Sequence, residues 1–108
     1  MMDIIIVTRN EKVLDAFAPL SRARSINIRS IKPDELKAYI KRLAPGSLVY
    51  LDISSIPVED RTKTLKLLQK QPSVLYAILD PAGTESDPAA FFHGGASDYI
   101  GKNLLKKG

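Results

Sequence analysis

Apolar runs alternate along the chain with segments in which apolar residues recur every three to four positions. A continuous apolar run predicts a strand buried on both faces of a sheet, and the wider spacing predicts an amphipathic helix. The predicted strands are residues 4–7, 26–31, 48–53, 74–79 and 99–100. The predicted helices begin after Asn10, at Pro33, at Val58 and at Asp87. This alternation favours a parallel sheet with helices on both faces.

Cap and turn residues predict where the helices begin and end. The side chain of Asn10 is suited to capping the first helix, and Pro19 is expected to kink that helix or end it early. Gly46 is expected to stop the second helix, and the Gly94–Gly95 pair to stop the fourth.

Short right-handed connections leave few arrangements for such a chain, and the expected one is the flavodoxin-like α/β fold with strand order 2-1-3-4-5. We predict one domain over residues 1–108, because that length supports a single hydrophobic core. In this fold the functional site lies beyond the carboxyl ends of the strands, near the switch between strands one and three. The polar residues at those ends are Thr8, Arg9, Asp52, Asp80 and Lys102.

Composition and charge narrow the class of protein. The chain is 44% hydrophobic and 26% charged, as ordinary globular proteins are, and no apolar stretch approaches the ~20 residues of a membrane span. The chain lacks the pattern of a signal peptide and has no cysteine, which excludes disulfides and thiolate metal sites and favours a cytoplasmic protein. The net charge of +4 comes from scattered basic residues without neighbouring aromatics, which disfavours nucleic-acid binding.

Two stretches carry a resemblance to a known family. The sequence GGASDYIGKN (residues 94–103) resembles the fifth-strand signature of response-regulator receiver domains of the CheY-like family, where a Gly-Ala pair precedes an aromatic residue and then a lysine. The sequence LVYLDIS (residues 48–54) resembles the strand that ends in the phosphoacceptor aspartate of that family. Pro57, followed by Asp60, is similar to the loop after that aspartate, although the proline comes one residue later.

The resemblance, which extends from Asp3 to Leu104, implies roles for individual residues. It places Asp52 at the phosphoacceptor position and Lys102 at the position of the lysine that contacts the phosphoryl group. It also implies that Tyr99 is the aromatic residue that couples the pocket to the surface.

Two departures from the family pattern bear on its chemistry. The acidic pair that holds magnesium is replaced by Thr8 and Arg9, and the hydroxyl residue after strand four is replaced by Asp80, or by Leu79 if the alignment slips by one position. Phosphoryl transfer to a carboxylate depends on a divalent cation held by oxygen ligands. We therefore predict a degenerate pseudo-receiver without cofactor, metal or catalytic residues, in which Arg9 lies against Asp52 or Asp80 in place of the metal.

Other functions stay open at this stage. A working phosphorelay receiver phosphorylated on Asp52 would bind metal and a phosphoryl donor, and a flavodoxin-like small-ligand domain would retain its ligand on purification. An unrelated α/β domain with a structural aspartate at its sheet edge is a further alternative.

The expected partners are proteins rather than membranes or nucleic acids. The sequence NLLKKG (residues 103–108) leaves room for little more than one helical turn, so the last helix is expected to be truncated or absent, or the chain to be the front part of a longer protein. The resemblance then implies control of an attached or separate output partner. An exposed surface with Phe92 and Tyr99 is expected to contact that partner or to form a homodimer.

Overall fold

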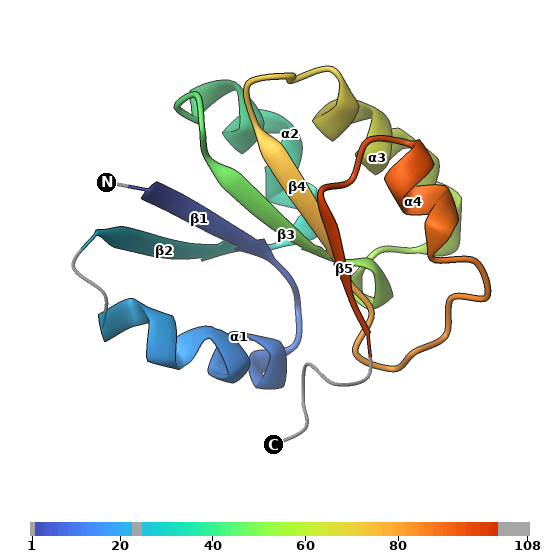
Figure 1. Ribbon diagram of the computed structural model, residues 1–108, viewed down its shortest axis with the longest axis horizontal. Helices are drawn as coiled ribbons and strands as arrows, with labels where there is room; N and C mark the ends of the chain where they lie inside the picture. The colour runs from blue at the N-terminus through green and yellow to red at the C-terminus, as the bar shows by residue number, and fades with distance from the viewer. Residues whose placement is uncertain (1, 23–24, 102–108) are drawn as a thin grey trace.

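The computed structural model describes residues 2–22 and 25–101. They form one parallel five-stranded sheet in the order β2-β1-β3-β4-β5, drawn in Figure 1. The strands are β1 (Met2–Val7), β2 (Ile26–Ile31), β3 (Leu48–Asp52), β4 (Leu75–Leu79) and β5 (Asp98–Ile100). The predicted α/β class and strand order are confirmed, and the predicted strand limits differ from the observed ones by two residues at most.

The helices are short, and several begin or end in 3-10 turns. They are α1 (Glu11–Phe17), α2 (Leu36–Tyr39), α3 (Arg61–Gln69) and α4 (Ala89–His93). The Asn10 side chain accepts a hydrogen bond from the Lys12 amide at 2.9 Å and so caps α1, as its sequence predicts. The helix ends two residues before Pro19 and continues as a 3-10 turn over Ala18–Arg22.

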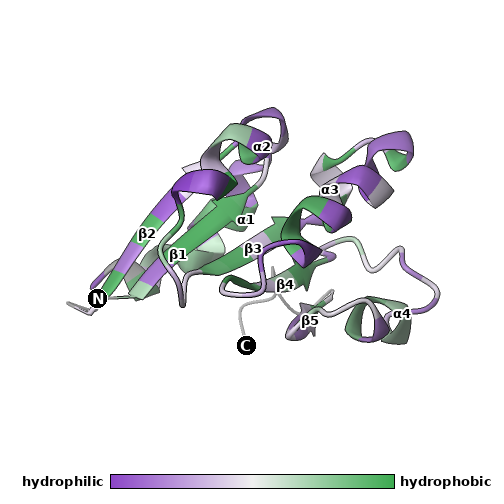
Figure 2. Ribbon diagram, turned by 90° about the horizontal axis from the view of Figure 1, so that it is seen from above, coloured by the Kyte–Doolittle hydropathy of each residue, from purple (hydrophilic) through white to green (hydrophobic). Residues whose placement is uncertain are grey.

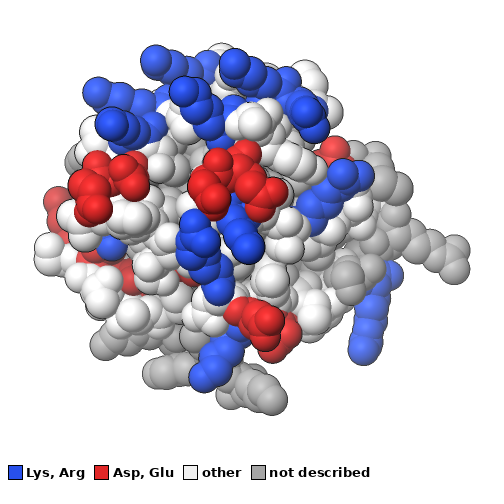
Figure 3. All heavy atoms as spheres, turned by 180° about the vertical axis from the view of Figure 1, so that it is seen from behind, with Lys and Arg blue, Asp and Glu red and all other residues white. Residues whose placement is uncertain are grey.

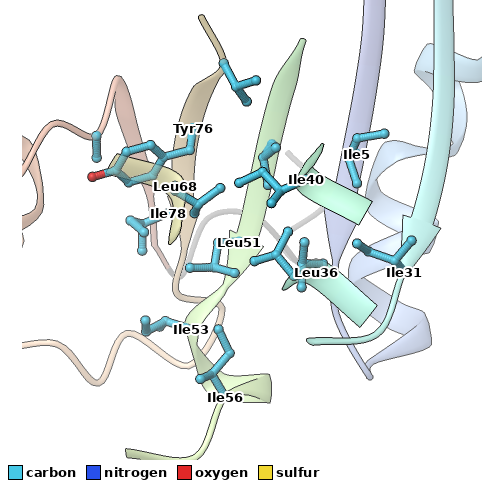
Figure 4. Close-up of a cluster of buried hydrophobic side chains, with 14 residues drawn as sticks. Ile5, Ile31, Leu36, Ile40, Leu51, Ile53, Ile56, Leu68, Tyr76 and Ile78 are labelled. Atoms are coloured by element: carbon cyan, nitrogen blue, oxygen red, sulfur yellow. The ribbon is translucent and has the colours of Figure 1, made fainter. Parts of the chain in front are cut away.

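The two faces of the sheet carry separate hydrophobic clusters. On one face, side chains of α2 and α3 pack on β1, β3 and β4, and Figure 4 shows Leu36, Ile40 and Leu68 in one cluster with Leu51 and Ile78 of the strands. The other face is covered by α1, whose Val13 and Phe17 lie against Ile4, Ile6 and Leu79. Figure 2 shows the central strands as the most hydrophobic part of the chain, which agrees with strands buried on both faces.

The topology brings the carboxyl ends of β1, β3 and β4 to one edge of the sheet. Val7 is paired with Leu51 and Asp52 with Leu79, so Thr8, Asp52 and Asp80 follow one another across the strand ends. Lys102 and the predicted truncated last helix lie outside the described residues. No helix in the described part of the chain is long and apolar enough to cross a membrane.

Candidate functional site

Asp52 is the centre of the first polar cluster at this edge, and it is completely buried. Its Oδ2 accepts hydrogen bonds from the Thr8 hydroxyl at 2.6 Å and from the Ser55 hydroxyl at 2.8 Å. Its Oδ1 accepts hydrogen bonds from the Ser54 hydroxyl at 2.6 Å and from the Ser54 amide at 3.1 Å. Both carboxylate oxygens are therefore occupied by donors from the chain itself.

The local sequence explains how these donors reach Asp52. The chain turns at the end of β3 into a 3-10 turn, Ile53–Ser55, and the Asp52 side chain caps that turn through the Ser54 amide. Thr8 arrives from the neighbouring strand β1, and its oxygen also accepts a hydrogen bond from the Asn10 amide at 3.0 Å. The Ser55 hydroxyl oxygen accepts the Arg9 amide proton at 2.9 Å. The cluster thus joins β1, β3 and the start of α1.

Arg9 lies away from both carboxylates, so the prediction that it replaces the metal beside Asp52 or Asp80 is wrong. Its guanidinium forms an ion pair with Asp34 at 2.9 Å, and the two side chains are 52% and 70% exposed. Thr8 is buried at the end of β1, whereas the next side chain, that of Arg9, is exposed and lies beside the turn that follows β2. In the described residues no three or more His, Cys, Asp or Glu side chains are grouped so that they could hold a metal ion.

Removal of the Arg9 side chain is expected to have little effect on stability. The Arg9→Ala variant should change the free energy of unfolding by less than about 0.5 kcal/mol, because exposed ion pairs are weak and the Arg9 amide that contacts Ser55 is kept. Urea unfolding followed by circular dichroism measures this change. A loss above about 1 kcal/mol would show that the arginine supports the Asp52 cluster after all.

Asp80 is the centre of a second and separate cluster. It is also completely buried, and its Oδ1 accepts hydrogen bonds from the Thr84 amide at 3.1 Å and the Thr84 hydroxyl at 3.3 Å. Its Oδ2 accepts hydrogen bonds from the Glu85 amide at 3.0 Å and from the Tyr99 hydroxyl. The carboxylate therefore fixes the start of the loop between β4 and α4 and ties that loop to β5.

The environment of this pair shifts both pKa values. Burial by itself would raise the pKa of the Asp80 carboxyl, but the hydrogen bonds from Tyr99, Glu85 and Thr84 outweigh burial, and that pKa lies below its ordinary value. Burial and the neighbouring Asp80 carboxylate raise the pKa of the Tyr99 phenol. At neutral pH the pair is a carboxylate and a protonated phenol.

The surface beside this second cluster carries the aromatic residues of α4 and β5. The ring of Tyr99 stacks on that of Phe91, with centroids 5.9 Å apart, and its hydroxyl is held by Asp80. Phe92 points outward and is 46% exposed. Arg61 at the start of α3 forms an ion pair with Glu85 at 3.3 Å, which ties the β4–α4 loop to α3 as well.

Sequence reasoning located the two aspartates but missed most of the groups that satisfy them. It identified Thr8 as a pocket residue without assigning it to Asp52, and it named none of Ser54, Ser55 and Thr84 as site residues. The signal for the first two was the pair of serines directly after Asp52, because Ser and Asp side chains form local turns and caps. Thr84 lies four residues after Asp80 in a loop whose conformation the sequence pattern leaves open.

Comparisons with known proteins find similar folds among solved structures. No protein-family model matches the sequence, and no curated protein matches it either. The response regulator RcsB of Salmonella typhimurium, from work on its conformational dynamism for DNA interaction, matches with a TM-score of 0.77 at 15% identity, covering 98% of this chain and 57% of that chain. The Mn²⁺-bound form of the response regulator Rcp1 matches with a TM-score of 0.67 at 17% identity, covering 95% of this chain and 86% of that chain.

These likenesses define the structural class. The chain has the fold of response-regulator receiver domains, and it spans little more than half the length of the RcsB chain that it matches. At such low identity the comparison concerns the fold, and the chemistry must come from the residues at the strand ends.

Proposed function

We propose that this chain is a receiver-like regulatory interaction module of the cytoplasm, which acts through protein contacts and does not accept a phosphoryl group on Asp52. The observation that carries the proposal is the environment of Asp52. Its carboxylate is completely buried, and hydroxyls of Thr8, Ser54 and Ser55 occupy both oxygens. This carboxylate serves as a structural hydrogen-bond acceptor that joins β1 to β3.

Phosphoryl transfer would have to undo that arrangement. An attacking carboxylate oxygen must approach the donor phosphorus in line, and a divalent cation must neutralise the charge of the oxygens around it. Approach to Asp52 Oδ2 would break its hydrogen bonds to Thr8 and Ser55, and approach to Oδ1 would break those to Ser54. The family resemblance implies a hydroxyl residue at the position of Asp80. The Asp80 carboxylate is instead bonded to its own loop and to Tyr99, so this position supplies no hydroxyl to an incoming phosphoryl group.

The same module offers a surface for a partner. The Asp80 cluster fixes the β4–α4 loop and Tyr99, and Phe92 is exposed beside them. We propose this α4–β5 surface, with Phe92 and Tyr99, as the place where the module contacts an attached or separate output partner or a second copy of itself. Lys102, two residues after the end of β5 in the sequence, is proposed as a pocket residue at the carboxyl edge of the sheet.

Incubation with magnesium and acetyl phosphate tests the proposal directly. Intact-mass spectrometry is expected to show no phosphoryl adduct on the wild-type chain, because both Asp52 oxygens are already bonded within the fold. Isothermal titration with magnesium is expected to give no binding heat.

The Asp34→Ala variant is the control, because it removes an exposed carboxylate away from Asp52. An adduct that persists in Asp34→Ala and that tandem mass spectrometry assigns to Asp52 would contradict the proposal and establish a phosphorelay receiver instead.

A further inference from the structure

Two elements on one face of the sheet carry basic residues and no acidic ones. These elements are α2 with the 3-10 turn Ile40–Arg42 that follows it, and α3 with the residue after it. Their exposed cations are Lys37, Lys41, Arg42, Lys63, Lys66 and Lys70. We refer to these six residues as the basic ridge.

The two elements that carry the basic ridge lie on the same face of the sheet. Leu36 and Ile40 of the first element and Leu68 of the second belong to the same buried cluster, so both elements lie side by side on one sheet face. The loops that follow them are joined by a hydrogen bond from the Gly46 amide to the Ser73 carbonyl at 2.7 Å. Figure 3 shows lysine and arginine side chains gathered along the top of the molecule, where Figure 1 places α2 and α3.

The cations of the basic ridge have no ion-pair partners among the described residues. The ion pairs among the described residues are Arg9–Asp34 and Arg61–Glu85, and neither involves a ridge residue. Favourable interaction with helix carboxyl ends accounts for the ridge residues that lie in last turns, which are Lys37, Lys41, Arg42 and Lys66. It does not account for Lys63, which lies in the first turn of α3, where a positive charge is unfavourable.

A partly apolar hollow of about 160 Å³, which Gln69 and Gln71 also line, lies beside the ridge, between the end of α3 and the end of α4. Its walls include Leu68, Pro72, Val74 and Tyr76, with Gly94 on the α4 side. For comparison, an engineered apolar cavity of roughly 150 Å³ admits a benzene molecule. The hollow is therefore large enough for one apolar side chain, and its position at the end of α3 places Lys70 next to it.

We propose that the basic ridge and this hollow together dock an acidic protein segment that carries an apolar anchor residue. The inference rests on the proposed function and adds to the α4–β5 surface a second protein-binding surface, on α2 and α3, with a stated ligand chemistry. Carboxylates of the segment would pair with ridge cations that lack partners within the described chain, and the anchor would enter the hollow. A nucleic-acid strand fits less well, because the one aromatic residue of the ridge elements, Tyr39, is half-buried with its hydroxyl bonded to Arg29.

A fluorescein-labelled peptide of alternating glutamate and leucine residues is the probe for this surface. Fluorescence anisotropy is expected to show saturable binding to the wild-type chain, weakened by about tenfold in the double variant Lys66→Glu/Lys70→Glu, because two exposed attractions become repulsions. Lys12→Glu, on α1 and the other sheet face, makes the same charge change and should leave the affinity unchanged within about twofold.

The Gly94→Leu variant tests the hollow separately from the charges. The φ of Gly94 is −81°, which a residue with a side chain adopts without strain. An added Cβ would make one unusually close contact, at 3.1 Å from the flexible end of the Gln69 side chain, so the substitution should be tolerated. Its side chain is expected to block the anchor and to weaken binding of the peptide severalfold, while Ala90→Leu, exposed on α4, should not.

Several outcomes would overturn the proposal. The proposal is wrong if the peptide shows no saturable binding, or if Lys12→Glu weakens peptide binding as much as the ridge double variant does. It is also wrong if Gly94→Leu binds the peptide with full affinity, or if a single-stranded oligothymidylate binds as tightly as the peptide or more tightly. None of these outcomes depends on phosphorylation. The acetyl phosphate experiment therefore tests the proposed function independently of this docking surface.

Discussion

Replacement of Asp52 by alanine is expected to lower the free energy of unfolding by about 3 kcal/mol. The variant removes an acceptor that is completely buried and leaves three hydroxyls and one amide without their partner. Thr8, itself buried, cannot turn to solvent to recover its hydrogen bond. Urea unfolding followed by circular dichroism at pH 7 gives the difference from the wild type.

Two further variants show whether the effect comes from the hydrogen-bond cluster. Asp34→Ala removes a carboxylate that is exposed and should cost less than about 0.5 kcal/mol. Asp52→Asn keeps an acceptor of the same shape and should fall between wild type and alanine, because the hydroxyls of Thr8 and Ser55 can rotate to accept its amide protons. A loss below about 1 kcal/mol for Asp52→Ala would mean that Asp52 is not a structural acceptor, and would remove the main support for the proposed function.

The fold was predictable because it follows from the pattern of apolar and polar residues within short segments of the sequence. The continuous apolar runs of β1 and β3 can be satisfied only in a sheet that is covered on both faces, and right-handed crossovers then limit the order of strands. The place of Asp52 followed from the same logic, because the polar residue that ends a buried strand must lie at the sheet edge.

The partners of the aspartates were less predictable, because they depend on side-chain directions at chain turns. Thr8 and Arg9 are neighbours in sequence, yet one is buried against Asp52 and the other extends over the surface to Asp34. Opposite charge suggested that Arg9 would neutralise Asp52. Short hydroxyl side chains satisfy the Asp52 oxygens by hydrogen bonds instead, because they reach a buried carboxylate without the desolvation of a second charge.

The two aspartates belong to different parts of the molecule, although they end adjacent strands. Asp52 joins β3 to β1 and the start of α1, whereas Asp80 joins β4 to β5 and the β4–α4 loop. No hydrogen bond links one cluster to the other among the described residues. The effects of substitutions at Asp52 and at Asp80 on the free energy of unfolding should therefore be nearly additive. Substitution of Asp80 or Tyr99 should alter the α4–β5 surface, and substitution of Asp52 should not.

Removal of the Tyr99 hydroxyl is expected to lower the free energy of unfolding by about 2 kcal/mol at pH 7, because that hydroxyl donates to a buried carboxylate. The Tyr99→Phe variant keeps the ring that stacks on Phe91, so the change reports on the hydrogen bond alone. Tyr39→Phe is the matched control. Its hydroxyl accepts a hydrogen bond from Arg29 at 3.4 Å on the surface, and its loss should cost less than about 0.5 kcal/mol.

The pH dependence of this difference separates the hydrogen bond from a packing effect. The folded pKa of Asp80 lies below its ordinary value of 3.8, so its contribution to stability is present above that pH and is lost as the pH falls through the folded pKa. The folded pKa of Tyr99 lies above its ordinary value of 10.0, so its contribution is complete below pH 10 and is lost as the pH rises toward the folded pKa. The difference in free energy of unfolding between wild type and Tyr99→Phe should therefore be largest between pH 3.8 and pH 10.0, and should become smaller in acid and in alkali. Urea unfolding at a series of pH values measures it, and a difference that stays constant from acid to alkali would show that Tyr99 stabilises the fold by packing and that the hydroxyl does not hold Asp80.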